Sequence, residues 1–195
     1  MMRALLCAGA LALAGCAALP PPAVEDPQVL ALRERARDAV NPAFSLSGRF
    51  VVKGPEQTAS AALDWQHAKD RDELQINGPL GKVLAQLVRD AQGVRLIDER
   101  QRVTEAATLD ELSRAVFGAE LPLSRAAYWV TGRPGSADVR SRDAAGRVAV
   151  LTEQSWRVEF TEYDGDGPDA LPRQIDASDG EHSFRLRIDA WYPLP

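Results

Sequence analysis

Apolar and polar residues alternate with a period of two over most of the chain beyond residue 43. In residues 43–54, for example, Phe44, Leu46 and Phe50 share one phase, and serine and arginine residues occupy the other. A period of two places successive side chains on opposite faces of a β-strand. The pattern predicts about ten short strands, at residues 43–54, 58–66, 72–77, 82–90, 93–99, 102–104, 137–143, 147–154, 156–163, 173–178 and 182–191.

Three segments have the residue spacing of helices instead. Residues 27–40 follow an Asp-Pro start signal and carry one apolar stripe on an otherwise charged surface. Residues 108–118 open with the capping-box pair Thr108 and Glu111 and close on a glycine. A shorter helix is predicted at residues 124–130.

This order of elements predicts a mainly β fold of the α+β class. Consecutive hairpins give an antiparallel sheet with one apolar face and one wet face. Because strands twist, a long sheet of this kind curls, and we expect the helices at 27–40 and 108–130 to cover its concave apolar face. No repeat or second-domain boundary is visible, so residues 27–195 are expected to form a single domain.

The N-terminal segment has a different character. Arg3 precedes an apolar run at residues 4–14, which is shorter than the roughly 20 residues of a membrane-spanning helix but typical of a secretory signal. The run ends in LAGC, which resembles the lipobox of bacterial lipoproteins. That resemblance implies a signal peptide of residues 1–15, with S-diacylglycerol and N-acyl lipid on Cys16. Residues 16–26, with three consecutive prolines, would be an extended tether. The alternative is an ordinary secretory signal with an incidental cysteine.

The residue after the lipobox bears on localisation. In bacterial lipoproteins an aspartate there favours retention in the inner membrane, and this chain has Ala17. The implied localisation is the outer membrane of a Gram-negative bacterium, on the face toward the periplasm. Cys7 would leave with the signal peptide and Cys16 would carry lipid, so the mature chain would have no disulfide and would depend on its core.

The charge balance narrows the range of partners. The chain has 23 Lys and Arg residues against 28 Asp and Glu residues, a net charge of −5. Without a basic patch it is not expected to bind nucleic acid. The same acidic balance argues against broad electrostatic adhesion to anionic lipid.

Catalytic and metal-binding patterns are missing from the sequence. His67 and His182 stand among polar residues, without HExxH or CxxC spacing. The stretch DGDGPD at 164–169 has the composition of a calcium loop. However, Asp169 and Ile175 occupy its sixth and twelfth positions, where an EF-hand needs Gly and Glu. There is no G-x-S-x-G elbow and no phosphate-binding loop. We expect neither enzyme activity nor any cofactor beyond the covalent lipid.

One turn carries an unexpected side chain. In NGPLG, Leu80 is surrounded by the turn formers Gly78, Pro79 and Gly81. Such a turn belongs at the surface, where a large apolar side chain gains nothing from water. Either Leu80 folds back onto the core or caps a strand, or it reaches an apolar partner outside the protein.

Taken in order, the motifs resemble a known family. They are the lipobox, SLSGRF at 45–50, NGPLG at 77–81, YWVTGRP at 128–134, WRVEFTEY at 156–163, and LPRQI, DG and FRLRIDAW near the end. This ordered set resembles the LolB family of outer-membrane lipoproteins, the terminal receptors of the Lol lipoprotein-sorting pathway. The resemblance implies an incomplete antiparallel β-barrel with helices over an apolar cavity. It also implies that lipoproteins are taken from the periplasmic carrier LolA and inserted into the inner leaflet of the outer membrane, without nucleotide hydrolysis.

The resemblance assigns roles to particular residues. Leu80 matches a leucine on a protruding loop that family members need to release acyl chains into the membrane. Cys16 would serve localisation more than transfer. Electrostatic attraction is implied to orient the carrier, but the negative net charge leaves open whether this protein contributes the acidic or the basic side. Arg49, Arg133 and Arg173 are candidates for that contact, or they are solvated charges at strand edges. The protein is expected to be a monomer.

Periodicity nominates the wall of the expected acyl-chain cavity. The candidates are Phe50, Trp65, Leu74, Ile76, Leu87, Trp156, Phe160, Leu186 and Ile188. Alternation does not distinguish a hollow core from a filled one, so the same residues could pack an ordinary interior. Two other functions stay open at this point: a passive module for lipopolysaccharide or phospholipid, and a structural lipoprotein that ties the outer membrane to peptidoglycan or to an assembly machine.

Overall fold

A computed structural model describes residues 43–56, 58–118 and 121–193. The signal peptide expected at 1–15, the tether at 16–26 with Cys16, and the helix expected at 27–40 lie outside the described residues.

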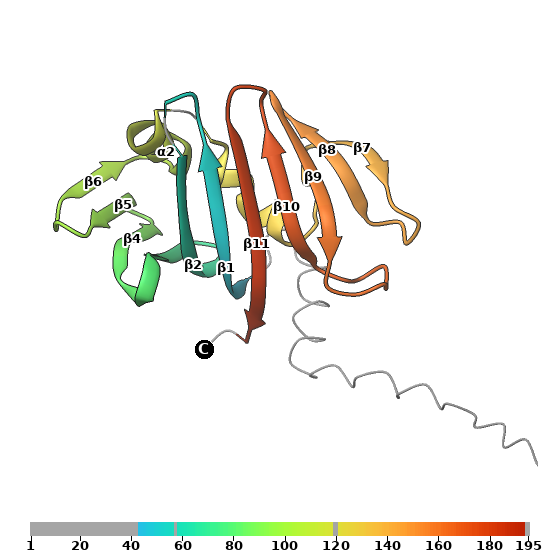
Figure 1. Cartoon of the computed structure of the whole chain (residues 1–195), viewed down its shortest axis with the longest axis horizontal. Helices are drawn as coiled ribbons and strands as arrows, with labels where there is room; N and C mark the ends of the chain where they lie inside the picture. Colours follow the sequence, from blue (N-terminus) through green and yellow to red (C-terminus); the bar gives the residue numbers. More distant parts are fainter. Residues whose placement is uncertain (1–42, 57, 119–120, 194–195) are drawn as a thin grey trace, which may run out of the picture.

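Eleven strands form one open antiparallel sheet (Figure 1). They are β1 (Phe44–Lys53), β2 (Thr58–Ala68), β3 (Arg71–Asn77), β4 (Val83–Asp90), β5 (Gly93–Asp98), β6 (Val103–Ala106), β7 (Asp138–Arg142), β8 (Val148–Glu153), β9 (Trp156–Tyr163), β10 (Pro172–Ser178) and β11 (Ser183–Tyr192). Their order across the sheet is β6-β5-β4-β3-β2-β1-β11-β10-β9-β8-β7. The first and last strands therefore pair in the middle, and β6 and β7 are the two edges. The strands lie where the alternation predicts them, and the mainly β, antiparallel fold is confirmed.

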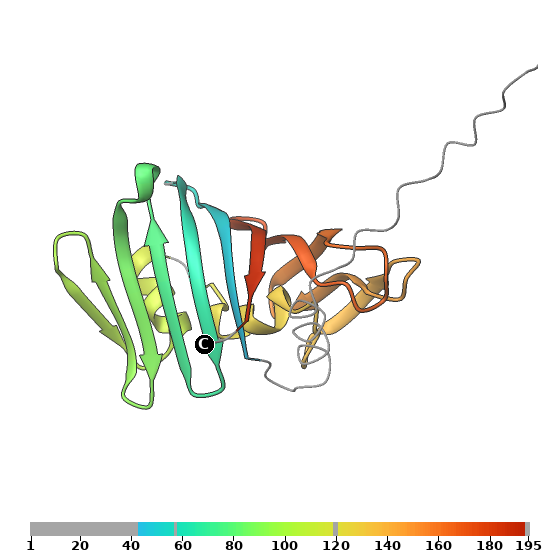
Figure 2. The ribbon, with the colours of Figure 1, turned by 90° about the horizontal axis from the view of Figure 1, so that it is seen from below.

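The helices α2 (Leu109–Phe117) and α3 (Ala126–Val130) lie on the same side of the sheet (Figures 1 and 2). The start of α2 is the predicted one, because the Thr108 hydroxyl accepts the Glu111 N–H at 3.1 Å. The helix ends at Gly118, whose φ of 72° is the left-handed conformation of a helix C-cap.

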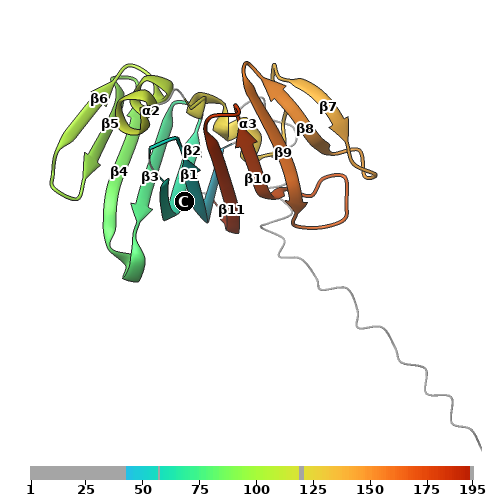
Figure 3. The same ribbon diagram turned by 45° about the horizontal axis from the view of Figure 1, so that its top comes forward.

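The helix predicted at 124–130 is divided in the structure. A 3₁₀ turn, η2 (Leu123–Arg125), leads directly into α3. Figure 3 shows the sheet bending around these helical pieces, with β4–β6 on one side and β7–β9 on the other.

A β-bulge marks the middle of the sheet. The β1–β11 register shifts at Gly48, and Asp189 is the extra residue of β11. A Cβ atom on Gly48 would lie 2.5 Å from the Arg187 carbonyl oxygen, so only glycine fits this close approach. On the outer face the Asp189 carboxylate binds Arg49, with 2.8 Å between Oδ1 and Nη2.

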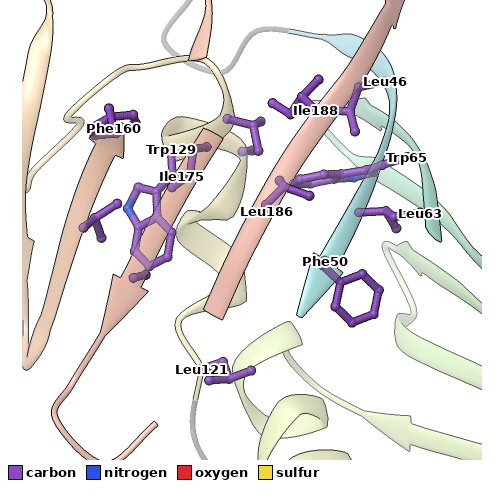
Figure 4. Packing of buried hydrophobic residues seen from close by; sticks show 14 of the residues in the cluster. Leu46, Phe50, Leu63, Trp65, Leu121, Trp129, Phe160, Ile175, Leu186 and Ile188 are labelled. Atoms are coloured by element: carbon purple, nitrogen blue, oxygen red, sulfur yellow. The ribbon is translucent and has the colours of Figure 1, made fainter. Parts of the chain in front are cut away.

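The main core is built chiefly by β1, β2, β8–β11 and α3 (Figure 4). A second, smaller cluster lies under α2 and joins Leu87, Val94, Leu109 and Leu112. Burial along β1 follows the predicted alternation, with Phe44, Leu46, Phe50 and Val52 inside. The apolar face of the sheet is therefore the face that carries the helices.

Candidate functional site

An apolar cavity of about 270 Å³ is lined by residues of the sheet and of both helices. One water molecule needs about 10–15 Å³ of such space, so the cavity is large enough for an extended stretch of an apolar chain. Six of the nine wall residues nominated from the sequence line it: Phe50, Trp65, Leu74, Ile76, Leu87 and Leu186. Their part in binding acyl chains stays a prediction.

Three nominated wall residues lie elsewhere. Trp156, Phe160 and Ile188 do not line the cavity and are buried in the main core. Figure 4 shows Phe160 well apart from Phe50. Alternation assigned these residues to the correct face of the sheet, but the spacing between sheet and helices decides where a hollow remains. Trp156, Phe160 and Ile188 are packed within the main core, whereas Ile175 of β10 and Leu186 of β11 reach the cavity.

The helices supply wall residues that the sequence reasoning missed. These are Leu109, Leu112, Val116 and Phe117 from α2, and Ala126, Trp129 and Val130 from α3. The signal was present for α2, since Leu109, Leu112 and Val116 follow one another at helical spacing. For α3 the segment is too short to show a face.

The chemistry of the wall is almost wholly apolar. Among the described residues that line the cavity none is charged, and the hydroxyl groups are those of Ser60 and Ser113. The Ser113 hydroxyl is already engaged, because it accepts the Leu121 N–H at 2.9 Å and lies 2.8 Å from the Asp110 carbonyl oxygen. Such a wall offers a guest mainly dispersion contacts and shelter from water.

Two tryptophans of the wall carry polar N–H groups. The Trp65 indole, 5% exposed, donates its Nε1–H to Asp72 Oδ1 at 2.9 Å. Asp72 is 2% exposed and also binds His67 Nδ1 at 2.5 Å and Arg89 Nε. Burial would raise the pKa of Asp72, but the hydrogen bonds with His67, Arg89 and Trp65 outweigh burial and hold that pKa below its ordinary value. Sequence reasoning missed this network.

A second buried carboxylate holds the other tryptophan. Trp129 of α3 donates its Nε1–H to Glu153 Oε2 at 3.3 Å. Glu153, at the end of β8, is 8% exposed, and its Oε1 lies 2.8 Å from Arg125 Nε. Arg125 in turn donates to the Ser136 hydroxyl at 3.0 Å and packs over the Tyr128 ring at 4.5 Å. Glu153 thus contacts both Trp129 of α3 and Arg125, the residue that precedes this helix.

The NGPLG turn joins β3 to β4 and directs Leu80 away from the protein. Leu80 is fully exposed, so it neither folds back onto the core nor caps a strand. Its backbone has φ 61° and ψ 20°, a left-handed conformation that costs a non-glycine residue energy. The turn is closed by a 2.8 Å bond from the Gly78 N–H to the Lys82 carbonyl oxygen, and Lys82 is paired with Glu99 of the β5–β6 turn. Leu80 is thus exposed at the tip of the turn, as the sequence predicts. Its contact with a membrane stays a prediction.

The three arginines proposed for carrier contact do not form one cluster. Arg49 is paired with Asp189 on the outer face of the sheet. Arg173 shares Glu162 with Arg187, at 3.5 and 2.9 Å. Arg133 lies partly buried in the loop after α3. Carrier contact by these residues stays a prediction.

Metal binding finds no support in the described part of the chain. His67 belongs to the Asp72 network, and His182 contacts Asp179 in the β10–β11 turn at 3.3 Å. The described residues hold no group of three or more His, Cys, Asp or Glu side chains that could bind a metal ion. Within the same ranges, none of the helices has the length and apolarity needed to cross a membrane.

The chain is similar to known outer-membrane proteins over nearly its whole length. The family model described as outer membrane lipoprotein LolB matches residues 42–191. Outer-membrane lipoprotein LolB of Azoarcus sp. is 36% identical over 191 residues, which cover 97% of this chain and 94% of that protein. The proteins of the same name from Thiobacillus denitrificans and Dechloromonas aromatica are 34% and 33% identical, and each match covers at least 93% of both chains.

Among solved structures the likeness is more distant. A LolA superfamily protein from Nitrosomonas europaea covers 85% of this chain at a TM-score of 0.47 and 10% identity. The assignment depends on the sequence matches, which include the segments that build the cavity and the exposed turn. The chain belongs to the LolB family of outer-membrane lipoproteins.

Proposed function

We propose that this protein receives lipoproteins from the periplasmic carrier LolA and inserts them into the inner leaflet of the outer membrane. As a LolB family member it has a role in lipoprotein sorting and is not an enzyme. The observation that carries the proposal is the apolar cavity lined by the sheet and by residues of α2 and α3. In this proposal the cavity shelters the acyl chains of a client from water between its release by the carrier and its insertion into the membrane.

The energetics explain why such shelter is needed. An acyl chain has roughly 15 methylenes, and burial contributes about 0.8 kcal/mol for each. Keeping one chain out of water therefore contributes on the order of 10 kcal/mol. A free lipoprotein could not cross the periplasm at a useful rate. Transfer needs no nucleotide if the receptor binds the chains more tightly than the carrier does, because a difference in affinity alone shifts the population.

Leu80 has a separate role in the proposal, at the membrane. Burial of one leucine side chain contributes about 1.5–3 kcal/mol, enough for a transient contact but not for an anchor. The anchor is the lipid on Cys16, which holds the protein on the periplasmic face. The left-handed backbone of Leu80 and the closed NGPLG turn keep the side chain directed outward.

Replacement of the tip residue tests the proposal. Leu80→Glu is expected to leave the fold and lipoprotein acceptance near the wild-type level, because the side chain has no packing to lose. Delivery of a fluorescent lipoprotein from the receptor to liposomes is expected to slow severalfold, since a carboxylate does not enter the headgroup boundary. Val103→Glu is the matched control: Val103 is another exposed apolar residue, on the edge strand β6.

Three results would each contradict one part of the proposal. If Leu80→Glu delivers lipoprotein as fast as wild type, the membrane role of the tip is wrong. If the wild-type protein never accepts lipoprotein from LolA but binds free lipid, the protein is a passive lipid-binding module. If an uncharged dye such as Nile red does not bind at all, the cavity is not a binding site.

A further inference from the structure

The two tryptophans of the cavity wall share one arrangement. Each turns its indole N–H to a buried carboxylate that does not line the cavity: Asp72 for Trp65 and Glu153 for Trp129. Each carboxylate is also paired with an arginine, Arg89 or Arg125. The two networks stand in opposite halves of the sheet, one on β2–β4 and the other between β8 and α3.

The two tryptophan–carboxylate hydrogen bonds determine whether the cavity wall presents an apolar or a polar surface to a bound molecule. A buried N–H without an acceptor is unfavourable, so an indole that loses its carboxylate turns toward another partner or recruits water. In an apolar cavity either change places a polar group or a water molecule where an acyl chain would lie. With the carboxylate present, the apolar part of the indole forms the wall.

We propose that Asp72 and Glu153 are positioning residues that keep the indole N–H groups of Trp65 and Trp129 out of the cavity, and so determine its affinity for acyl chains. This inference rests on the proposed function for the identity of the guest. Neither carboxylate touches the guest, and each acts through its tryptophan.

Glu153 offers the cleaner test of the two. Asp72 also binds His67 and Arg89, so its removal disturbs several buried groups at once. The α3 helix has only five residues, and Glu153 contacts both Trp129 on the helix and Arg125 just before it. Glu153 thus adds a polar contact from the sheet to a helix whose Ala127, Trp129 and Val130 are packed in the main core.

The test is a double-mutant cycle on Nile red binding. In the pair variant Arg125→Met with Glu153→Leu, both charges are replaced by apolar groups of similar size, a change that is often neutral for stability. The pair variant is expected to bind the dye at least about fivefold more weakly, because Trp129 has lost its acceptor. In a Trp129→Phe background the same pair change is expected to have no further effect, because no N–H remains to be satisfied.

A conservative variant and a surface control complete the design. Glu153→Gln keeps an acceptor oxygen for Trp129 and is expected to recover most of the affinity lost in the pair variant. It is also expected to unfold at lower urea, because Arg125 then has no counter-charge. Glu159→Gln removes an exposed carboxylate that pairs with Arg157 at 2.7 Å on β9, and it is the matched control.

The outcomes separate this inference from the proposed function. Equal losses of affinity in the tryptophan and phenylalanine backgrounds, or no loss in either, would overturn the positioning role. Dye binding that follows the cycle, without displacement of the dye by a tripalmitoylated peptide, would support the positioning role and contradict the lipoprotein-receptor function.

Discussion

Replacing Leu80 by glycine is expected to stabilise the protein while slowing delivery. Leu80 is fully exposed and has φ 61°, so its side chain contributes no packing but its backbone carries strain. A left-handed residue other than glycine costs about 1–2 kcal/mol. Glycine removes that cost but loses about 0.5–1 kcal/mol through its greater freedom in the unfolded chain. The difference is a gain of about 0–1.5 kcal/mol in the free energy of unfolding.

Urea unfolding at neutral pH measures this gain, provided that the slope m stays the same in variant and wild type. Gly81→Ala is the matched control in the same turn, since Gly81 has φ 76° and open space around the position of a Cβ atom. Alanine there meets strain without a clash and is expected to destabilise the fold by about 1 kcal/mol. Delivery to liposomes is then measured on both proteins.

Two results would refute the reasoning. If Leu80→Gly lowers the free energy of unfolding, the leucine side chain contributes to the fold and is not simply held out. If Leu80→Gly delivers lipoprotein at the wild-type rate, the leucine side chain makes no membrane contact that matters for delivery. A more stable protein that delivers slowly is the outcome that fits both the strain and the proposed role.

Three further predictions concern the Asp72 network, the central bulge and the anchor. Burial raises the pKa of Asp72, but the hydrogen bonds to its carboxylate lower that pKa by a larger amount, so the net shift is downward. The ionised carboxylate therefore stabilises the fold at pH values above the unfolded pKa of about 3.9. This contribution is lost as the pH falls through the folded pKa. In urea unfolding measured from pH 7 down to pH 2, the free energy of unfolding of Asp72→Asn is therefore expected to fall less steeply than that of the wild type. An unchanged pH dependence would contradict this role of Asp72. Gly48→Ala places a Cβ atom 2.5 Å from the Arg187 carbonyl oxygen and is expected to cost about 1–3 kcal/mol in thermal unfolding, so a wild-type melting temperature would mean that the bulge yields freely. Cys16→Ala is expected to move the protein from the outer-membrane fraction to the periplasmic fraction, and its persistence in the membrane fraction would argue against lipidation.

Period-two alternation was sufficient to predict the strands, and burial follows it most clearly along β1, β2 and β9. It could not predict the extent of the cavity. Trp65 and Trp156 both lie on the apolar face, yet Trp65 lines the hollow and Trp156 is packed in the core. The difference depends on where α2 and α3 stand relative to the sheet, and a strand pattern carries no information about that distance.

The buried carboxylates were missed for a different reason. Alternation predicts polar residues on the outer face, but Asp72 stands in phase with the apolar Leu74 and Ile76 of β3, and His67 in phase with Leu63 and Trp65 of β2. A polar residue in the inward phase of a strand was the available signal. The sequence alone does not show which residue pairs with Asp72, because Arg89 comes from β4 and reaches Asp72 only through the β3–β4 register.

The pairing of β1 with β11 has a consequence for the order in which the molecule can be made. The six strands β1–β6 and the five strands β7–β11 are joined within the sheet only through that one pair. A chain still missing its last residues holds two unconnected half-sheets, and Phe50 lacks its partner Leu186 across the hollow's midline. Such long-range closure is slow. Because Phe184 and Leu186 of β11 line the apolar cavity, its wall is complete only once β11 has paired with β1.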